Sequence, residues 1–327
     1  MRAWFRLACA ALAVWFTAGL VSTAQAEPLR VAHTVWVGFG PLFIAQEKDL
    51  FAAEGVEVEL IRIEEHTTTY AGLYSGQIDA VAAAFQDAPA FSDPNEAPLV
   101  CVLMLDDSRG ADGILAARDI RSIADLAGRS VAVLHGSVSH FYLSVLLQEA
   151  GLTQADLEIV DLSAEDAGEA FLLQEVDAAV TWEPWLTQGR TTDHGHVLTD
   201  SSERPGLLVD GLLTRADVFA ERKDDFRAVA RAWDAAIGYF ASHPDEATRI
   251  MARHVGGWLE DPAVFAETLQ GVAYYDAEEN LEYFGTPDRP GQIYQTAQHA
   301  IDVWASVGML KMTLSPSDII AHGIWDE

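Results

Sequence analysis

Strand-like and helix-like patterns alternate along this chain, and that alternation constrains the fold more than any other feature. The run "LRVAHTV" (29–35) has the apolar character of a buried strand, and "PLFIAQEKDLF" (41–51) has helical spacing with Pro41 in its first turn. The same order continues to "DAVAAAF", restarts at "SVAVLHG" and ends at "DAAVTW". Two such blocks predict an α/β protein built on open, mostly parallel sheets.

The restart of the pattern predicts two lobes. We expect lobe 1 to contain residues 27–112 and 212–327, with the helical C-terminal tail packed back onto it, and lobe 2 to contain residues 113–211. Crossovers near residues 108–113 and 205–212 would join the lobes and leave a cleft between them. In open α/β sheets, ligands bind outside the carboxyl ends of the strands, so the cleft is the expected binding site.

The first 26 residues have the three parts of a signal peptide. Arg2 and Arg6 precede an apolar run at 7–20, and "AQA" at 24–26 provides a small-residue cleavage site. The apolar run is shorter than the roughly 20 residues of a membrane-spanning helix. We therefore expect cleavage before Glu27 and a periplasmic protein.

The charge of the chain limits the classes of partner that it can bind, and its cysteine content limits the disulfides that it can form. The chain has 20 Lys and Arg against 50 Asp and Glu, a formal net charge of −30, which disfavours binding to nucleic acid or to anionic lipid. Cys9 would leave with the signal peptide, so Cys101 remains alone and cannot form an intrachain disulfide. These features favour a monomer whose core needs no covalent bridge.

The carboxyl ends of the predicted strands supply candidate ligand-binding side chains. Aromatic, acidic and helix-capping residues predominate there, and Lys and Arg are absent from these positions. Structural roles are open for several of them: the tryptophans could pack between the lobes, the serine could cap a helix, and the aspartates could cap helices or hold the hinge. The candidates are Trp36, Phe39, Glu65, Asp87, Ser137, His140, Trp182, Glu183, Trp185 and Asp210.

The stretch "DAAVTWEPWL" (177–186) gives the sharpest prediction. It places Glu183 at the end of a strand between two indoles, and Pro184 restricts the backbone there. An unpaired carboxylate partly shielded from water attracts a cation more strongly than an exposed one. We therefore expect Glu183 to bind a cation, with Asp87 or Asp210 as a second acid.

Other chemistries receive less support. Asp193, His194 and His196 could bind a metal, but the surrounding Thr and Gly residues indicate an exposed loop. The chain has no G-x-S-x-G, H-E-x-x-H or P-loop motif, and "GFGPLF" lacks the third glycine of a dinucleotide-binding loop. The sequence therefore predicts a binding protein without a cofactor or a metal, rather than an enzyme.

Four stretches resemble the nitrate/sulfonate/taurine-type solute-binding proteins of ABC importers. They are "VWVGFGPLFIAQEKDLFAAEGVEVEL", "GLYSGQIDAVAAAF", "DAAVTWEPWL" and "SHPDEATRIMARHVG". The resemblance implies a type II periplasmic-binding-protein fold, with two lobes and two crossovers that close on a small solute. It also implies an inner-membrane permease as the partner.

The resemblance leaves the ligand open. Most ligands of that family are anions or neutral pyrimidines, but the strand ends here supply carboxylates and aromatic rings. "DDSRGADGI" together with "TWEPW" also resembles members encoded beside guanidine-responsive genes, which implies a guanidinium-type cation. The alternatives are a small anion such as a sulfonate, nitrate or bicarbonate, a pyrimidine, and an enzyme similar to the thiamine-pyrimidine synthases that share this fold.

Overall fold

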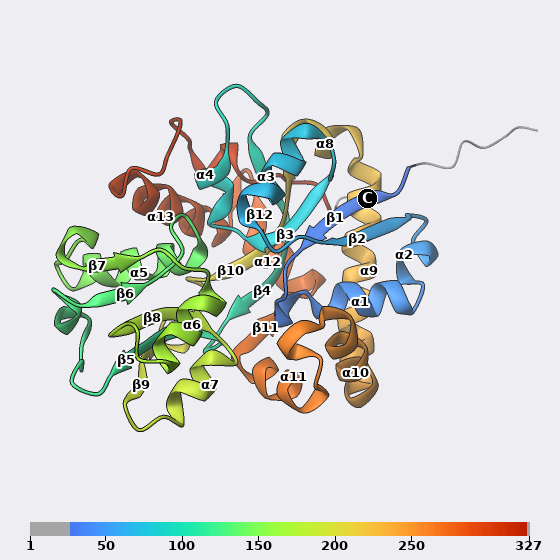
Figure 1. The fold of residues 1–327 in the computed structure, drawn as a ribbon. Helices are drawn as coiled ribbons and strands as arrows, with labels where there is room; N and C mark the ends of the chain where they lie inside the picture. Colours follow the sequence, from blue (N-terminus) through green and yellow to red (C-terminus); the bar gives the residue numbers. More distant parts are fainter. Residues whose placement is uncertain (1–26, 326–327) are drawn as a thin grey trace, which may run out of the picture.

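The computed structural model describes residues 27–325 as two β-sheets with helices on both sides (Figure 1). The predicted signal peptide lies outside the described residues. Within 27–325, no helix has both the length and the apolar character needed to cross a membrane. The α/β fold class is confirmed. Its two main sheets are mixed rather than mostly parallel, because the strands that cross between them pair antiparallel with their neighbours.

The first sheet has six strands in the order β11-β4-β10-β3-β1-β2. Strand β1 pairs in parallel with β2 and β3, whereas β10 runs antiparallel to both β3 and β4. The central strands β3 and β4 are almost entirely buried, whereas the edge strand β2 is partly exposed and includes Glu59 and Arg62. The strands are β1 (Leu29–His33), β2 (Val58–Arg62), β3 (Ala80–Ala84), β4 (Leu99–Ser108), β10 (Val209–Arg215) and β11 (Val272–Tyr274).

The second sheet has five strands in the order β7-β6-β8-β5-β9. Strand β6 pairs in parallel with β7 and β8, and β5 runs antiparallel to β8 and β9. Each sheet thus contains an antiparallel strand that arrives directly from the other sheet, β10 in the first and β5 in the second. In the first sheet β11 also runs antiparallel to its neighbour β4. The strands are β5 (Asp112–Ala117), β6 (Ser130–Ala132), β7 (Glu158–Val160), β8 (Ala178–Trp182) and β9 (Gly195–Asp200).

Helices bury the faces of both sheets. On the first sheet, α1 packs against α9 and α10, and its apolar residues join the sheet core. In the second sheet, α6 packs on β8. The helices are α1 (Gly40–Glu47), α2 (Leu50–Ala53), α3 (His66–Ser75), α4 (Asp87–Phe91), α5 (Val138–Glu149), α6 (Ala164–Leu172), α7 (Trp185–Arg190), α8 (Ala216–Glu221), α9 (Lys223–Ser242), α10 (Pro244–Val255), α11 (Pro262–Thr268), α12 (Ala277–Phe284) and α13 (Ile293–Ser306). Two strands of two residues each, β12 (Gly285–Thr286) and β13 (Arg289–Pro290), form a hairpin apart from both sheets.

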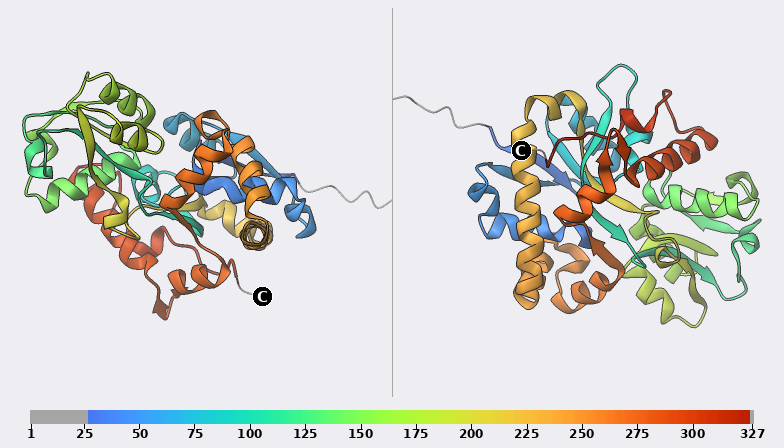
Figure 2. Two further views of the ribbon diagram at one scale, coloured as in Figure 1. Left: turned by 90° about the horizontal axis from the view of Figure 1, so that it is seen from below. Right: turned by 180° about the vertical axis from the view of Figure 1, so that it is seen from behind.

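The C-terminal tail differs from the sequence expectation in one respect. Helices α9 and α10 pack with the first sheet as expected, but α13 lies against both α4 and α5 (Figure 2). Trp304 of α13 is fully buried, and its ring lies 5.6 Å from that of Phe141 in α5. The tail therefore also contributes to the core beside the second sheet, since a large aromatic side chain is buried there.

Two short connections join the sheets, and they are hydrogen-bonded to each other. Residues 109–111 link β4 to β5, and residues 201–208 link β9 to β10. The carboxylate of Asp107 accepts from the backbone N–H of Gly206 at 2.9 Å, and Ser201 Oγ accepts from the N–H of Gly110 at 2.7 Å. Gly110 has φ of +124°, a conformation that side-chain-bearing residues rarely adopt. The assignment of two lobes with these connections as a hinge stays a prediction.

Candidate ligand-binding cleft

A cavity of about 140 Å³ lies between the two sheets. Residues that follow β1, β2 and β3 line it from the first sheet, and residues at the ends of β6, β7 and β8 line it from the second. The crossover strands β5 and β10 contribute their first residues. The cavity thus lies at the carboxyl ends of the parallel strands, where the sequence reasoning expected it.

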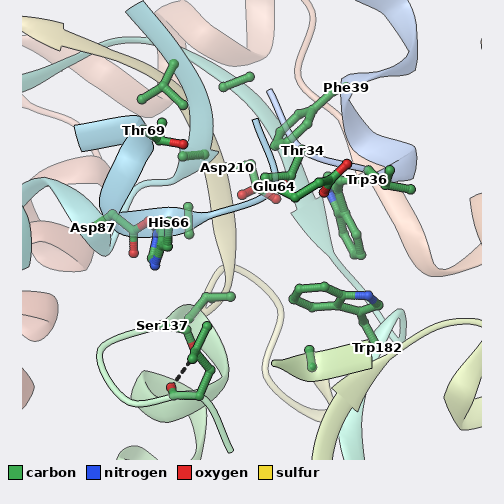
Figure 3. Close-up of a pocket in the computed structure, with 18 of the residues that line it drawn as sticks. Thr34, Trp36, Phe39, Glu64, His66, Thr69, Asp87, Ser137, Trp182 and Asp210 are labelled. Carbon is green, nitrogen blue, oxygen red and sulfur yellow. Dashed lines mark hydrogen bonds and ion pairs between the residues drawn. The ribbon is translucent and has the colours of Figure 1, made fainter. Parts of the chain in front are cut away.

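The structure brings together part of the predicted set. The residues of that set that line the cavity are Trp36, Phe39, Asp87, Ser137, Trp182 and Asp210 (Figure 3). Those that do not line it are Glu65, His140, Glu183 and Trp185.

Two indoles form one wall of the cavity. Trp36 follows β1 and Trp182 ends β8, and their ring centroids lie 6.3 Å apart with the planes at 62° (Figure 3). Trp36 Nε1 donates to Asp106 Oδ1 at 3.1 Å, which fixes that ring. Trp182 Nε1 is buried and has no hydrogen-bond partner among the described residues. The two rings come from different sheets and together form a wall that a ligand in the cavity can contact.

The charged side chains around the cavity are almost all acidic. Neither Lys nor Arg is among its described lining residues. Burial raises the pKa of Asp210 well above its ordinary value, raises that of Asp112 to about 6, and raises that of Glu165. Burial thus removes much of the water that would stabilise the charged form of these carboxyls. A bound cation would stabilise that form in place of the water. The acidic lining residues are Glu64, Asp87, Asp112, Glu165 and Asp210.

Asp87 is the best oriented of these acids. Its Oδ2 accepts from Tyr70 Oη at 2.6 Å and lies 2.7 Å from His66 Nε2. Its Oδ1 is buried and has no partner among the described residues. Burial opposes a charge on His66, but the facing Asp87 carboxylate outweighs it and raises the pKa of His66. Asp87 is therefore held by two groups and keeps one oxygen available for a ligand N–H.

Glu183 corrects one sequence expectation. Its carboxylate is not unpaired: it accepts from the Thr187 N–H at 2.8 Å and from Thr187 Oγ1 at 3.1 Å. Arg190 Nη1 lies 2.9 Å from Glu183 Oε1 and forms an ion pair with it. The sequence reasoning overlooked that α7 begins immediately after Pro184, which places Thr187 and Arg190 one and two turns away on the face that Glu183 occupies. The carboxylate thus anchors α7 beside Trp182.

Trp185 also has a packing role. It is the first residue of α7, and its ring lies so close to Gly168 of α6 that a Cβ there would come within 2.5 Å of Trp185 Cγ. Only glycine allows this approach of the indole to the helix backbone. Trp185 therefore joins α7 to α6 behind the cavity.

The remaining predicted residues serve helix ends or the core. The Glu65 carboxylate caps α3 by accepting from the N–H groups of Thr67 and Thr68. Ser137 caps α5 through the N–H of His140, and it also lines the cavity. His140 accepts from the Gly136 N–H at 2.9 Å, and burial together with the charge of neighbouring His135 lowers its pKa to about 4.

Several lining residues lie outside the predicted set. Glu64 and His66 belong to the same strand end as Glu65, which was chosen in their place, and Tyr70 follows His66 by four residues on one face of α3. Glu165 lies in the first turn of α6, after the end of β7. The rule of strand ends therefore identifies the right segments, but it does not tell which of neighbouring side chains enters the cavity.

The described residues contain no group of three or more His, Cys, Asp or Glu side chains placed to hold a metal ion. In the stretch that suggested one, His194 Nε2 instead lies 3.2 Å from the backbone oxygen of Phe171.

Comparison with known proteins places the chain in a family. Residues 36–247 match the family described as NMT1/THI5 like. A putative aliphatic sulfonates-binding protein of Bacillus subtilis is 27% identical over 240 residues, which are 68% of each chain. The periplasmic aliphatic sulphonate binding protein SsuA of Escherichia coli has a TM-score of 0.70 at 21% identity, covering 89% of this chain and 96% of that one. The desulfurization enzyme DSZB shares the fold with a TM-score of 0.62 at 15% identity, covering 90% and 97%.

The relatives therefore include periplasmic binding proteins, and the fold also occurs in an enzyme. The family match extends from Trp36 to the helices after the second sheet, so it contains most residues that line the cavity. This chain belongs to the NMT1/THI5-like family.

Proposed function

We propose that this protein is the periplasmic solute-binding component of an ABC importer and that its solute is a small guanidinium-type cation. The signal-peptide pattern in residues 1–26 supports export, and the names of the relatives support solute binding. An inner-membrane permease would receive the solute. The protein binds its solute without converting it.

The charge of the cavity lining is the observation that carries the cation proposal. Five acidic side chains line the cavity, and no Lys or Arg is among the described residues that line it. Glu64 is the exposed one of the five and pairs with Arg62 outside the cavity lining. An anion in this position would meet repulsion in a medium that screens charge less than water does. A cation would instead offset the cost of burying Asp87, Asp112 and Asp210 away from water.

The size and the walls of the cavity narrow the cation further. A cavity of about 140 Å³ is close to the roughly 150 Å³ cavity that holds benzene in other proteins, so a ligand of about six non-hydrogen atoms fits. Guanidinium is planar and presents N–H donors in its plane, which suit carboxylate oxygens. Its faces suit indoles, since a cation near an aromatic face is attracted by the ring. Trp36 and Trp182 provide the rings, and Asp87 Oδ1 provides an acceptor without a partner.

An anion is the second candidate, because relatives are named for sulfonates. The cavity has some donors for one: Trp182 Nε1 lacks a partner, Ser137 lies at the start of α5, and His66 has a raised pKa. Helix N-termini also favour anions. These donors are outnumbered by the carboxylates, so we favour the cation.

Stoichiometric binding separates a binding protein from an enzyme. The carboxylates of the cavity could act as acids or bases, but Ser137 is already engaged in capping α5 and has no base beside it. We expect a one-to-one complex from which the solute is recovered unchanged. Chemical conversion of the bound solute would instead support the alternative of a pyrimidine-synthase-like enzyme.

A thermal-shift screen of the mature protein, refolded from denaturant to remove any bound solute, tests the proposal. The panel contains guanidinium, methylguanidinium, methanesulfonate, taurine, nitrate, bicarbonate and a pyrimidine. Ligand binding raises the melting temperature in proportion to the logarithm of ligand concentration above the Kd. We expect the guanidinium compounds to raise it and the anions to leave it unchanged; stabilisation by a sulfonate alone would favour the anion.

A further inference from the structure

Asp106 lies directly behind the cavity and faces one of its acids. It is fully buried in β4, and its Cα pairs with that of Asp210 across the antiparallel β4–β10 ladder. Asp210 lines the cavity and Asp106 does not. Both strands lead into the connections between the sheets, so the pair lies where the ligand site meets the crossovers.

The hydrogen bonds of Asp106 leave one oxygen without a donor. Its Oδ1 accepts from Trp36 Nε1, but its Oδ2 is buried and has no donor among residues 27–325. Gly38 lies directly against this carboxyl, and a Cβ atom on residue 38 would collide with it. Residues paired across an antiparallel ladder carry their side chains on the same face, with Cβ atoms about 4.5–5.5 Å apart, so the carboxyl of Asp210 is the neighbour of this carboxyl on the next strand. Two ionised carboxylates only accept, so a hydrogen bond between them requires a proton on one of them.

The surroundings of the pair disfavour two negative charges. Its titratable neighbours are the acids Asp87, Asp107 and Asp112 and the phenols of Tyr70, Tyr274 and Tyr275. The nearby cation, Arg109, is engaged by Asp107 at 2.8 Å, and the structure from 27 to 325 gives neither Asp106 nor Asp210 an ion pair with Lys or Arg. Burial raises the pKa of Asp106 to about 8 and that of Asp210 well above its ordinary value. Repulsion between two neighbouring carboxylates also raises the pKa of one of them, so that the pair retains one proton.

We propose that Asp106 and Asp210 share one proton while the cleft is empty, and that a cationic ligand contacting Asp210 displaces this proton to solvent. This inference rests on the proposed function. The pair has a charge of −1 with the proton and −2 without it, so the exchange replaces one positive charge by another. Asp106 is a positioning residue in this exchange, because it acts on the ligand only through Asp210.

The exchange makes charge a criterion of selection. Urea has the planar shape of guanidinium but is neutral, so it cannot replace the charge of the proton, and the pair would keep its proton when urea is present. Guanidinium stays charged at every pH at which the protein is folded. One proton is released for each guanidinium bound. At pH values below the pKa of the pair, the affinity for guanidinium should therefore increase about tenfold for each unit by which the pH is raised.

Calorimetric titration with guanidinium chloride in two buffers of different ionisation enthalpy, at pH 7, counts the protons released. We expect close to one proton per ligand for the wild type. Asp106→Asn keeps an oxygen for Trp36 Nε1 and provides an amide N–H to Asp210 in place of the proton, so we expect release close to zero. The variant's affinity should also vary less with pH between 6.5 and 7.5. His66 titrates in both proteins, so the difference between them isolates the pair.

Asp107→Asn is the matched control. It neutralises the neighbouring buried acid, which bonds Arg109 and Gly206 and faces away from the ligand, so release should stay near one proton. Circular dichroism checks that each variant is folded. If Asp106→Asn does not fold, His66→Gln takes its place: it removes the other titrating group, so release of one proton by this variant would still come from the pair. Binding of guanidinium to the wild type without proton release would overturn the exchange and leave the proposed function standing. Absence of guanidinium binding would overturn both.

Discussion

The indoles of Trp36 and Trp182 meet edge to face across the cavity, with ring centroids 6.3 Å apart, although they come from different sheets. Trp36 is held from behind by Asp106, and Trp182 by the strand that leads into α7. This contact places the aromatic part of the site at the junction of the sheets. A ligand that lies beside both rings would contact both sheets at once.

Replacing Trp36 or Trp182 by leucine should weaken guanidinium binding by about 0.5–2 kcal/mol each, because each variant loses a cation–π contact. Binding to the wild type should also change tryptophan fluorescence. Trp185→Phe is the control, because Trp185 packs on Gly168 outside the cavity and its replacement should leave the affinity unchanged. Wild-type affinity in both leucine variants would assign Trp36 and Trp182 to packing alone.

Glu183→Gln should reduce stability more than affinity. The carboxylate is buried, and it bonds Thr187 and Arg190, so loss of its charge should lower the free energy of unfolding by about 1–3 kcal/mol. Chemical denaturation measures this change, and calorimetry measures the Kd. A hundredfold loss of guanidinium affinity at unchanged stability would instead show that Glu183 acts on the ligand.

Asp112→Asn should become more stable relative to the wild type as the pH rises. Burial raises the pKa of Asp112 to about 6 from an ordinary 3.8. Because the folded value is the higher one, the favourable contribution of the protonated carboxyl is complete below about pH 4 and is lost as the pH rises through 6. The amide cannot ionise, so the variant should gain up to about 3 kcal/mol relative to wild type between pH 4 and pH 8. Urea denaturation at both pH values measures it, and an equal difference at both would contradict the prediction.

Ligand binding should bring the sheets together about the connections at 109–111 and 201–208. Closure would let the acids of one sheet and the indole of the other reach the same ligand. Small-angle scattering of ligand-free protein should show a smaller radius of gyration with saturating guanidinium, and no change with urea. An unchanged radius with guanidinium would argue against hinge closure.

The fold class could be predicted from the sequence because the burial of strands and helices determines the spacing of apolar residues along the chain. Alternation of apolar strands and helices specified the α/β class, and the break after "LVCVLML" lies near the place where the chain leaves the first sheet. The packing of α13 across α4 and α5 could not be predicted, since an amphipathic helix shows that it has a buried face but not what covers it.

The cavity could be predicted in part, for a related reason. The ends of the strands identify which segments of the chain meet at the cavity. This information was sufficient to predict that Trp36, Asp87 and Asp210 line it. Which way a side chain points depends on the element that follows. Glu65 turns back to cap α3, and Glu183 turns toward Arg190 because α7 starts at once. Such local hydrogen bonds compete with a ligand for the same carboxylates.

Calorimetric titration of ligand-free wild type and Asp87→Asn, with guanidinium chloride and with sodium methanesulfonate, tests the charge selection of the cavity most directly. The amide of the variant keeps the shape of Asp87 but removes the charge that faces the ligand through the free Oδ1. We predict one-to-one binding of guanidinium to the wild type, at least tenfold weaker binding to Asp87→Asn, and no binding of methanesulfonate to either. Binding of methanesulfonate to the wild type, unchanged or tighter in Asp87→Asn, with no binding of guanidinium, would contradict the cation site.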